Sequence, residues 1–565
     1  MYFRNLILAT LLASWTQAPA QEIAKANKPV GNGNPISPCV FCADPTALVY
    51  DGRLYVYGTN DHQQFIANGK KGDNGYGNIK SLVVFSTDDM ANWTFHGTID
   101  VGKVCGSWCG QSWAPSAVWR ETENGQKEFF IYFANGGGSV GVIKGSTPIG
   151  PFRSPLSRAL ITGSSPGVSP CNWVFDPGVV IDENGTGWIA FGGGDPNAQG
   201  SKLLPNNARI AKLKDTMIAL DGKAVSLPAH YHFEASELNI FDGKFVYTYC
   251  TSWSDRNDWY SYSKRGTAKE PTACSMCYMV SDDPLNPDSW EYRGQYLANP
   301  GTFGYSYSNN HSHLQKFGDT YYLFYHTTGL EQNMNTGASG FRSIAVNKAI
   351  VNENAQRIST VTANNTGAQA TGYLNPYQLQ EAETMSTAGG ITYEDFSNIM
   401  KVPTYNTLGN DASQNLQIKM APGSWTMVRR VDFGKEGANT FMLRAKGTGT
   451  LEIRLGSLTA EASDRVEFSS TSYNDYTIEL TDTRYTGARN VYFVFTQATN
   501  VYFDAWQFTE KQSDGIHPVS NTQNAPTQYF DLSGKQISNV NQHHGIVIEQ
   551  QTNANGTTTH RKRMR

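Results

Sequence analysis

The sequence predicts an all-β protein: a five-bladed β-propeller followed by a β-sandwich of the jelly-roll type. Two observations predict this fold. A phrase that ends in an aromatic strand occurs five times at intervals of 58 to 77 residues, and the chain is rich in aromatic residues and glycine, with 29 Tyr, 27 Phe, 12 Trp and 54 Gly. Aromatic side chains favour pleated strands and glycine favours tight turns. The interval suits one four-stranded blade with a variable loop better than a helical repeat.

The chain begins with the pattern of a secretory signal peptide, which we place at residues 1–20. A single arginine precedes an apolar run at residues 6–15, and Ala-Pro-Ala at residues 18–20 suits a cleavage site. The apolar run is too short to span a bilayer, and no later segment reaches that length. We therefore expect a secreted protein, whether periplasmic, cell-surface or extracellular, without a transmembrane segment.

Eight cysteines lie in the first 280 residues and none lies after them. In an exported chain an even number of cysteines indicates disulfides first, with their pairing left open. Two Cys-x-x-Cys pairs also allow a zinc site. The cysteines are Cys39, Cys42, Cys105, Cys109, Cys171, Cys250, Cys274 and Cys277.

The five phrases place the propeller at residues 29–359. They read ADPTALVYDGRLYVYG, WAPSAVWRETENGQKEFFIYF, FDPGVVIDENGTGWIAFGG, FEASELNIFDGKFVYTYC and NHSHLQKFGDTYYLFYH. The second positions of the phrases are Asp44, Ala114, Asp176, Glu234 and His311. Because the innermost strand of every blade lines the propeller axis, equivalent positions converge on one cavity. We therefore expect three carboxylates and a histidine to meet there.

Three carboxylates in one cavity suit the hydrolysis of a glycosidic bond. Inversion needs one carboxylate that activates water and one carboxylic acid that protonates the leaving oxygen, about 6.5 to 9.5 Å apart. Burial or a nearby negative charge raises the pKa of the acid, so that it keeps its proton. Each residue has a structural alternative, since Asp-Pro often opens a turn. Glu237 is an alternative to Glu234 as the acid, although it sits inside the strand.

These phrases resemble glycoside hydrolase family 43 over roughly residues 35 to 350. The resemblance implies a five-bladed propeller and an inverting mechanism without an organic cofactor. It assigns Asp44 as the general base and Glu234 as the general acid, and Asp176 as the group that orients Glu234 and raises its pKa. It also implies that Arg342 reaches the substrate sugar and that His311 contributes to a central hydrated calcium ion.

Three candidate site residues have competing interpretations. Trp113 is a candidate wall of the sugar pocket, since aromatic rings cover the C–H faces of sugars, but it could equally be a packing residue. A single imidazole is not enough to indicate a calcium site, because Ca²⁺ prefers oxygen ligands. His311 could therefore also be a hydrogen-bonded core residue. For Arg342 the alternative is a surface ion pair.

A second domain follows a polar, turn-prone linker at residues 360–376. Residues 377–510 contain several strands in which apolar and polar residues alternate, as at Leu451, Ile453 and Leu455. Strands of this kind predict a separate β-sandwich of ordinary domain size.

The sandwich resembles carbohydrate-binding module family 6 through QEAETMS, RVDFG, LEIRLGS and VYFDAWQF. The resemblance implies a structural calcium ion held by Glu381, Glu383 and Asp504. Sugar binding is left open. The segment NTLGNDASQNLQI has no aromatic residue for the family's usual cleft, whereas a later loop offers Tyr473 and Tyr476.

Residues 511–565 form a polar C-terminal tail. Its phrases YFDLSGKQI and HGIVIEQ are similar to C-terminal sorting segments of proteins exported by some outer-membrane bacteria, and a disordered remnant is the alternative. The formal net charge of the chain is -4, and basic residues cluster only in the last seven, THRKRMR. Nucleic acid is therefore not an expected partner.

Together these patterns predict a secreted, inverting glycosidase that acts on arabinoxylan, arabinan or xylan fragments of the plant cell wall. The favoured activity is removal of α-L-arabinofuranosyl side groups by a monomer. A β-1,4-xylosidase or an endo-arabinanase of the same family is the alternative. A non-catalytic sugar-binding propeller is an alternative of another class, but such a protein would not require all three carboxylates.

Overall fold

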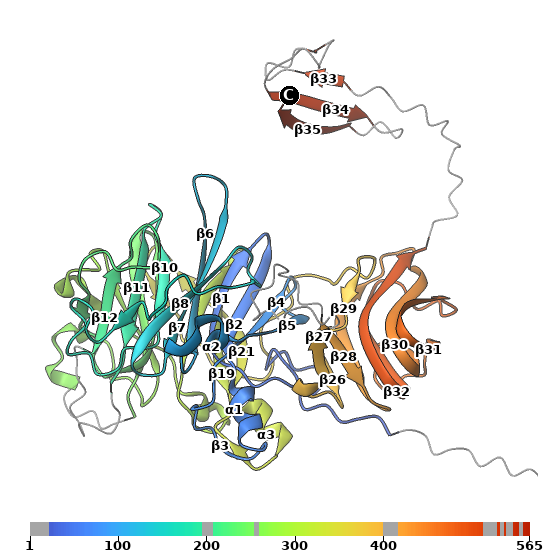
Figure 1. Cartoon of the computed structure of the whole chain (residues 1–565), viewed down its shortest axis with the longest axis horizontal. Helices are drawn as coiled ribbons and strands as arrows, with labels where there is room; N and C mark the ends of the chain where they lie inside the picture. Colours follow the sequence, from blue (N-terminus) through green and yellow to red (C-terminus); the bar gives the residue numbers. More distant parts are fainter. Residues whose placement is uncertain are drawn as a thin grey trace, which may run out of the picture. The chain divides into compact units, whose positions relative to one another are not determined.

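The computed structural model describes residues 22–194, 207–253, 259–398, 416–511, 528–530, 536–537, 546–552 and 558–564. It consists mainly of strands, arranged as a five-bladed propeller followed by a curled β-sheet domain (Figure 1). The predicted fold class is therefore confirmed. The predicted signal peptide lies outside the described residues.

Each of the first four blades contains four antiparallel strands that pair in chain order. The first blade contains β1 (Ala43–Tyr50), β2 (Arg53–Thr59), β4 (Leu82–Thr87) and β5 (Trp93–Ile99). The second contains β6 (Trp113–Glu121), β7 (Lys127–Asn135), β8 (Ser139–Gly145) and β9 (Ile161–Thr162). The third contains β10 (Gly178–Ile181), β11 (Gly187–Gly192), β12 (Ala208–Lys212) and β13 (Val225–Leu227). The fourth contains β14 (His232–Phe241), β15 (Lys244–Thr251), β16 (Met276–Ser281) and β17 (Glu291–Leu297).

The fifth blade has three described strands, β18 (Ser312–Phe317), β19 (Thr320–Thr327) and β21 (Ser343–Ala349). Two short pairs lie outside the blades: β3 (Gly72–Asp73) with β20 (Ala338–Ser339), and β22 (Val351–Asn352) with β23 (Arg357–Ile358). The helices are short: α1 (Asp61–Ala67), α2 (Val101–Cys105), α3 (Gly329–Met334), η1 (Gly106–Trp108), η2 (Trp259–Ser261), η3 (Ser263–Arg265), η4 (Pro287–Ser289) and η5 (Pro300–Phe303).

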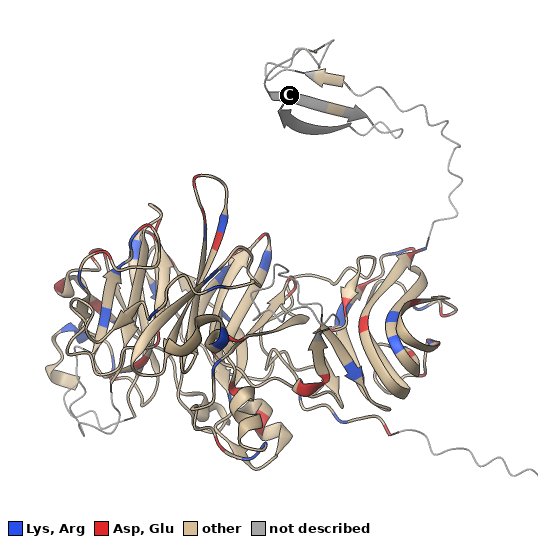
Figure 2. Cartoon of the chain, viewed as in Figure 1, with Lys and Arg blue, Asp and Glu red and all other residues tan. Residues whose placement is uncertain are grey.

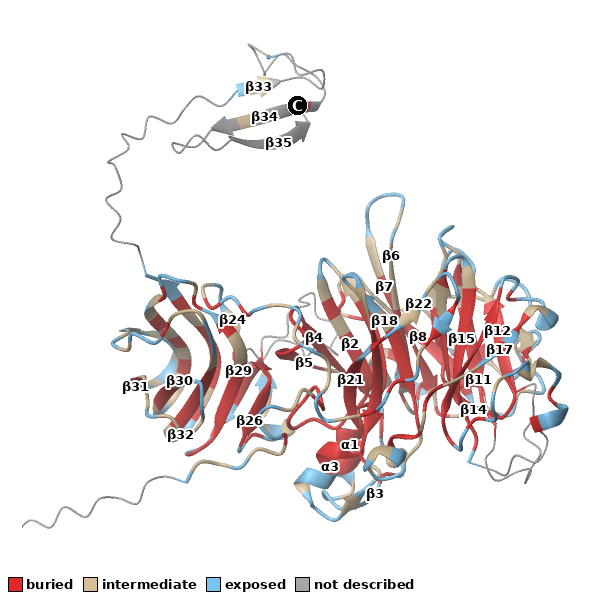
Figure 3. Cartoon of the chain, turned by 180° about the vertical axis from the view of Figure 1, so that it is seen from behind, coloured by how far each residue is buried: buried red, intermediate tan, exposed pale blue. Residues whose placement is uncertain are grey.

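Side chains on the inner strands join neighbouring blades. The N–H of Ala117 donates to Oγ1 of Thr46 at 3.2 Å, and the N–H of Val179 donates to Oγ of Ser116 at 2.9 Å. Apolar side chains pack between the blades, and most of the strand surface is buried (Figure 3). The hydroxyls satisfy N–H groups that these strands would otherwise bury without a partner.

The second domain is a single curled sheet built around three long strands, β30 (Ala438–Leu455), β31 (Asp464–Glu479) and β32 (Ala488–Glu510). Its buried apolar residues include Phe441, Phe493, Phe503 and Trp506. The shorter elements are β24 (Gln380–Glu381), β25 (Thr384–Met385), β26 (Thr387–Gly389), η6 (Tyr393–Asp395), β27 (Phe396–Asn398), β28 (Leu416–Met420) and β29 (Trp425–Asp432).

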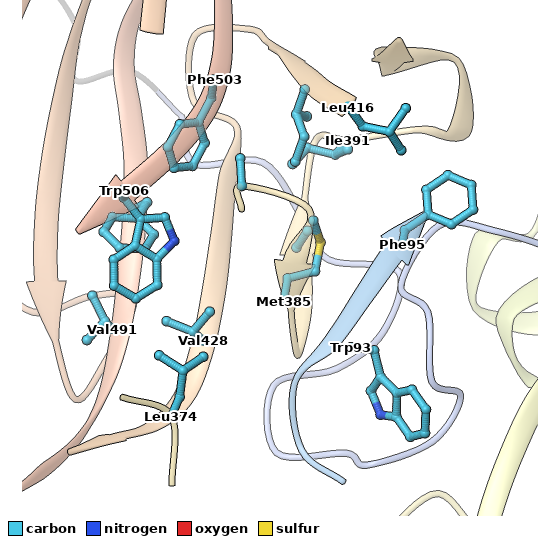
Figure 4. Close-up of a cluster of buried hydrophobic side chains, with 14 of the residues drawn as sticks. Trp93, Phe95, Leu374, Met385, Ile391, Leu416, Val428, Val491, Phe503 and Trp506 are labelled. Atoms are coloured by element: carbon cyan, nitrogen blue, oxygen red, sulfur yellow. The ribbon is translucent and has the colours of Figure 1, made fainter. Parts of the chain in front are cut away.

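The propeller and the curled sheet form one compact unit. Strand β25 pairs with β5 and so adds a fifth strand to the first blade. Trp93 and Phe95 of β5 belong to the same apolar cluster as Met385 and Trp506 of the second domain (Figure 4). Within the predicted linker, Leu374 is buried in this cluster.

A separate C-terminal unit contains β33 (Gln528–Phe530), β34 (Ile546–Thr552) and β35 (Thr558–Met564), which form an antiparallel sheet. Across the described residues, none of the helices has the length and apolar character needed to cross a membrane. Lys and Arg are interspersed with Asp and Glu over the propeller and the curled sheet (Figure 2).

The structure corrects the expectation for the cysteines. All eight are free, so the predicted disulfides are absent from these residues. Cys250 and Cys274 come near each other, but their sulfur atoms are 3.6 Å apart, whereas a disulfide bond is about 2.05 Å long.

Candidate active site

A cavity of about 370 Å³ opens at one end of the inner strands of the propeller. Its volume lies within the range of about 300 to 1,000 Å³ that is usual for small-molecule sites. All six propeller residues that the sequence analysis proposed for the site line this cavity: Asp44, Trp113, Asp176, Glu234, His311 and Arg342. The structure therefore brings together side chains that lie up to 298 residues apart in the chain.

The backbone turns sharply at four of the five phrases, where the chain enters the cavity. Asp44, Ala114 and Asp176 have positive φ values of 49°, 37° and 46°, and each is followed by a proline. Proline cannot adopt a positive φ, so the turn falls on the residue before it. In the fourth phrase Ala235 replaces the proline and takes the positive φ itself, at 63°. Strain of this kind is typical of functional sites.

Asp44 is a buried carboxylate held on both oxygens. Oδ1 accepts a hydrogen bond from Nη1 of Arg342 at 2.8 Å, and Oδ2 accepts one from Oγ1 of Thr59 at 2.8 Å. The N–H of Asp44 donates to Nδ1 of His326 at 3.1 Å. Burial raises the pKa of Asp44, but the Arg342 guanidinium, the neighbouring histidines His326 and His311 and the Thr59 hydroxyl together bring it below its ordinary value. A carboxylate that stays ionised is suited to act as a general base.

Arg342 bridges two buried carboxylates. Nη2 and Nε donate to the two oxygens of Asp61 at 2.8 and 2.9 Å, and the N–H of Arg342 donates to Asp61 at 3.0 Å. Nη1, which contacts Asp44, also donates to Oδ1 of Asn309 at 3.1 Å. The ring of Tyr76 lies 5.0 Å from the guanidinium carbon. This paired geometry fixes the orientation of the guanidinium, and the surface ion pair considered for Arg342 is not what the structure shows.

Asp176 and Glu234 are two buried carboxyl groups that influence each other. Oδ2 of Asp176 accepts the N–H of Ala235 at 2.9 Å, whereas Oε1 of Glu234 is buried without a hydrogen-bond partner among the described residues. Burial raises the pKa of both groups; the charge of Asp44 adds to the effect on Asp176, and the charge of Asp176 adds to the effect on Glu234. Because an N–H donor favours the ionised form, we assign the negative charge to Asp176 and the proton to Glu234.

His311 lies between Asp44 and Asp176. Its Nδ1 is 3.8 Å from Oδ1 of Asp44 and 4.0 Å from Oδ2 of Asp176. Burial lowers the pKa of His311 to about 4, so the imidazole is neutral near pH 7. In the part of the chain that the structure describes, no three His, Cys, Asp or Glu side chains are grouped to hold a metal ion. Calcium at His311 therefore stays a prediction.

Six lining residues were not predicted from the sequence: Tyr76, Trp173, Phe175, Phe233, Trp253 and Asn309. The repeated phrases could have identified two of these residues. Phe175 and Phe233 occupy the first position of their phrases, as Trp113 does in the second phrase. An aromatic residue at this position enters the cavity beside the following carboxylate. Trp253 and Tyr76 lie outside the phrases, and nothing in the repeat pointed to them.

Glu237, the alternative acid, lies outside this cavity. Its side chain is buried and its Oε1 is 3.3 Å from Nδ1 of His313. Burial raises the pKa of Glu237. The register of β14 against β15 shifts between Glu234 and Glu237.

Glu381, Glu383 and Asp504 of the curled sheet influence one another electrostatically, although among the described residues they are not grouped closely enough to form a metal site. Burial raises the pKa of Glu383, and the charges of Glu381 and Asp504 add to the effect. Oε2 of Glu383 is buried and has no hydrogen-bond partner among the described residues. Oxygen donors that repel one another in this way fit the ligand preference of Ca²⁺.

Comparison with known proteins agrees with this geometry. Residues 32–371 match the model of the glycosyl hydrolases family 43, and residues 381–510 match the model of the carbohydrate binding module (family 6). Two similar proteins are each named arabinoxylan arabinofuranohydrolase. The one from Paenibacillus polymyxa is 35% identical over 512 residues, which is 87% of this chain and 77% of that protein. The one from Bacillus subtilis (strain 168) is 34% identical over 526 residues, or 90% and 98% of the two chains.

A solved structure extends the similarity to three dimensions. It is the crystal structure of a glycoside hydrolase family 43 arabinoxylan arabinofuranohydrolase from Bacillus subtilis in complex with cellotetraose. The TM-score is 0.76 at 33% sequence identity, and the match covers 87% of this chain and 100% of the other. The similarity therefore includes the propeller and the curled sheet together.

Proposed function

The chain belongs to the glycosyl hydrolases family 43, as its repeated phrases predict, and we propose that it removes α-L-arabinofuranosyl side groups from arabinoxylan or arabinan. The observation that carries the proposal is the meeting of Asp44, Asp176 and Glu234 in one cavity. The choice of arabinoxylan is supported by the two relatives that are named for this substrate.

The proposed reaction is hydrolysis with inversion at the anomeric carbon. The ionised Asp44 accepts a proton from a water molecule, whose oxygen forms a bond to the anomeric carbon. The bond between that carbon and the leaving oxygen breaks on the opposite face of the sugar, and Glu234 gives its proton to the leaving oxygen. Asp176 keeps the pKa of Glu234 high until the proton is needed. Arg342, His311 and Trp113 contact the sugar from the cavity wall.

Aromatic residues at the rim support a polymeric substrate. Trp253 lines the cavity with 40% of its surface exposed, and Tyr307, which is 62% exposed, lies with its ring centre 6.4 Å from that of Trp253. Exposed rings of this kind suit the C–H faces of sugars. The polysaccharide backbone would lie across these two rings while one side group enters the cavity.

Further proposals concern the second domain and the location of the protein. The curled sheet binds a structural calcium ion through Glu381, Glu383 and Asp504, which the unpartnered oxygen of Glu383 supports. The protein is exported as a monomer, and the support for export is the apolar pattern of residues 1–20.

The test is to identify the monosaccharide that the full chain releases from arabinoxylan, with the Asp44→Asn variant as the blank. Release of arabinose by the wild type alone is the expected result. Release of xylose would move the assignment to a β-1,4-xylosidase. Release of arabinose oligomers from a linear arabinan, supplied in a parallel assay, would indicate an endo-arabinanase.

A further inference from the structure

A short segment of the second domain covers the propeller helix that lies behind the active site. The ring of Tyr393 in η6 stacks on the imidazole of His62 in α1, with ring centres 4.4 Å apart and planes at 21°. Two rings of the propeller also contact this imidazole: Phe41 at 5.4 Å with planes at 26°, and Phe65 edge-on at 5.3 Å. His62 is only 2% exposed. One side chain of the second domain thus completes the enclosure of a propeller histidine.

Polar contacts tie the same segment to both sides of α1. Oε1 of Glu394 is 2.6 Å from Nζ of Lys70, just after the helix. The amide of Asn60, just before the helix, donates to the hydroxyl of Tyr393 at 3.4 Å. Tyr393 and Glu394, which we call the clasp, therefore contact residues on both sides of the helix as well as its second residue.

Helix α1 is connected to the proposed base by a short series of contacts. Asp61, the first residue of α1, accepts three hydrogen bonds from Arg342, one from its backbone N–H and two from its guanidinium. The same guanidinium donates to Asp44 at 2.8 Å. A second connection runs through the backbone, because the N–H of Phe41 donates to Nδ1 of His62 at 3.3 Å. Phe41 precedes Asp44 by three residues. A shift of α1 would therefore move Asp44 from two sides.

We propose that the clasp is a positioning element for the hydrolytic reaction: it holds α1 so that Asp61 keeps Arg342, and hence Asp44, in the orientation needed to activate water. The inference rests on the proposed role of Asp44 as the base. It gives the second domain a part in the reaction that does not depend on sugar binding by that domain.

The clasp differs from the remainder of the contact between the domains. Elsewhere β5 is covered by apolar side chains such as Met385 and Ile391 (Figure 4), and Asn92 exchanges two hydrogen bonds with the backbone of Arg429 at 2.7 and 2.9 Å. Those contacts join the domains. The clasp is the part of η6 that contacts the helix bearing Asp61.

The test compares Tyr393→Ala with the matched variant Phe396→Ala in the full chain. The rings of Phe396 and Tyr393 both contact Phe95, at 5.1 and 6.2 Å. The Phe396→Ala variant, however, keeps the ring of Tyr393 on His62. Both variants lose an aromatic ring from one short segment. Assays are run well below the unfolding temperatures of both, measured by circular dichroism.

For Tyr393→Ala we expect kcat to fall roughly three- to tenfold with KM within about twofold of the wild type, because misplacing a reacting group costs rate more than binding. The factor should be the same for a 4-nitrophenyl pentoside and for the polysaccharide, since the water must be activated whatever the leaving group is. Tyr393→Phe, which keeps the ring, should restore at least half of the wild-type kcat, and Phe396→Ala should keep the wild-type kcat.

Two results would overturn the clasp inference: a wild-type kcat for Tyr393→Ala, or an equal loss of kcat in Phe396→Ala. Failure of the proposed function looks different. In that case Asp44→Asn would itself keep substantial turnover of the 4-nitrophenyl pentoside that the wild type hydrolyses.

Discussion

Nη1 of Arg342 donates a hydrogen bond to Oδ1 of Asp44 at 2.8 Å, and both side chains are almost fully buried. Burial raises the pKa of a carboxyl group, and the guanidinium is the largest of the effects that together lower the pKa of Asp44 below its ordinary value. The same guanidinium is held by Asp61 through two of its other nitrogens. Arg342 thus contributes to both the ionisation and the orientation of Asp44.

Replacing this arginine with lysine tests the dependence. An ammonium group is a point charge and cannot donate in parallel to Asp61 while reaching Asp44. For Arg342→Lys we expect kcat/KM to fall about 100-fold in steady-state assays, since the base is both misplaced and less ionised. Arg53→Lys is the control, because Arg53 pairs with Asp88 at the surface; activity there should be unchanged. Wild-type activity of Arg342→Lys would contradict the role of the guanidinium.

The acid is tested by changing the leaving group. Glu234→Gln removes the proton donor, so we expect kcat on arabinoxylan to fall about 1,000-fold, while kcat on a 4-nitrophenyl arabinofuranoside falls much less because its leaving group needs no proton. Glu237→Gln is the control, since that buried side chain lies outside the cavity. It should leave the ratio of the two rates unchanged. If Glu234→Gln slows both substrates equally, another group is the acid.

The pH dependence of kcat/KM tests the pairing of Asp176 with Glu234. Glu234 must be protonated to act, so loss of its proton sets the basic limb of the profile. Burial and the charge of Asp176 raise the pKa of Glu234. Asp176→Asn removes the charge, and we therefore expect the basic limb to move to lower pH. A basic limb that stays in place or moves to higher pH would show that Asp176 does not raise the pKa of the acid.

The shared apolar cluster predicts that the propeller and the curled sheet unfold together. Met385 is 3% exposed and lies between Trp506 on one side and Phe95 on the other (Figure 4). For Met385→Ala we expect a loss of about 2 to 5 kcal/mol in unfolding free energy and one calorimetric transition at a lower temperature. Leu285→Ala, at an exposed site, should leave the transition in place. Two separate transitions in the wild type would contradict a common core.

The sequence predicted the parts of this molecule that repeat. Asp44, Asp176 and Glu234 could be identified because they share one position in the phrase, and equivalent inner strands converge in a propeller. Asp61 could not be identified in this way. It lies in α1, between the strands β2 and β4 of the first blade, and meets Arg342 across 281 residues of sequence, a contact that depends on how two connecting segments pack.

The junction between the domains was also beyond sequence patterns. The polarity of residues 360–376 predicted a linker, yet Leu374 is buried and β25 pairs with β5. The composition of a segment gives its average polarity. It does not show which few side chains of that segment are buried. The disulfide prediction was wrong for a related reason, since a count of cysteines contains no distances between them.

The central claim is that a water activated by Asp44 attacks from the face opposite the leaving group. The most direct measurement is the anomeric configuration of the first sugar released, followed by proton NMR from the start of the reaction on a 4-nitrophenyl α-L-arabinofuranoside. The account predicts that the β-anomer appears first and that the α-anomer grows in afterwards by mutarotation. Initial release of the α-anomer would mean retention through a covalent intermediate, and it would contradict the assignment of Asp44 as a general base.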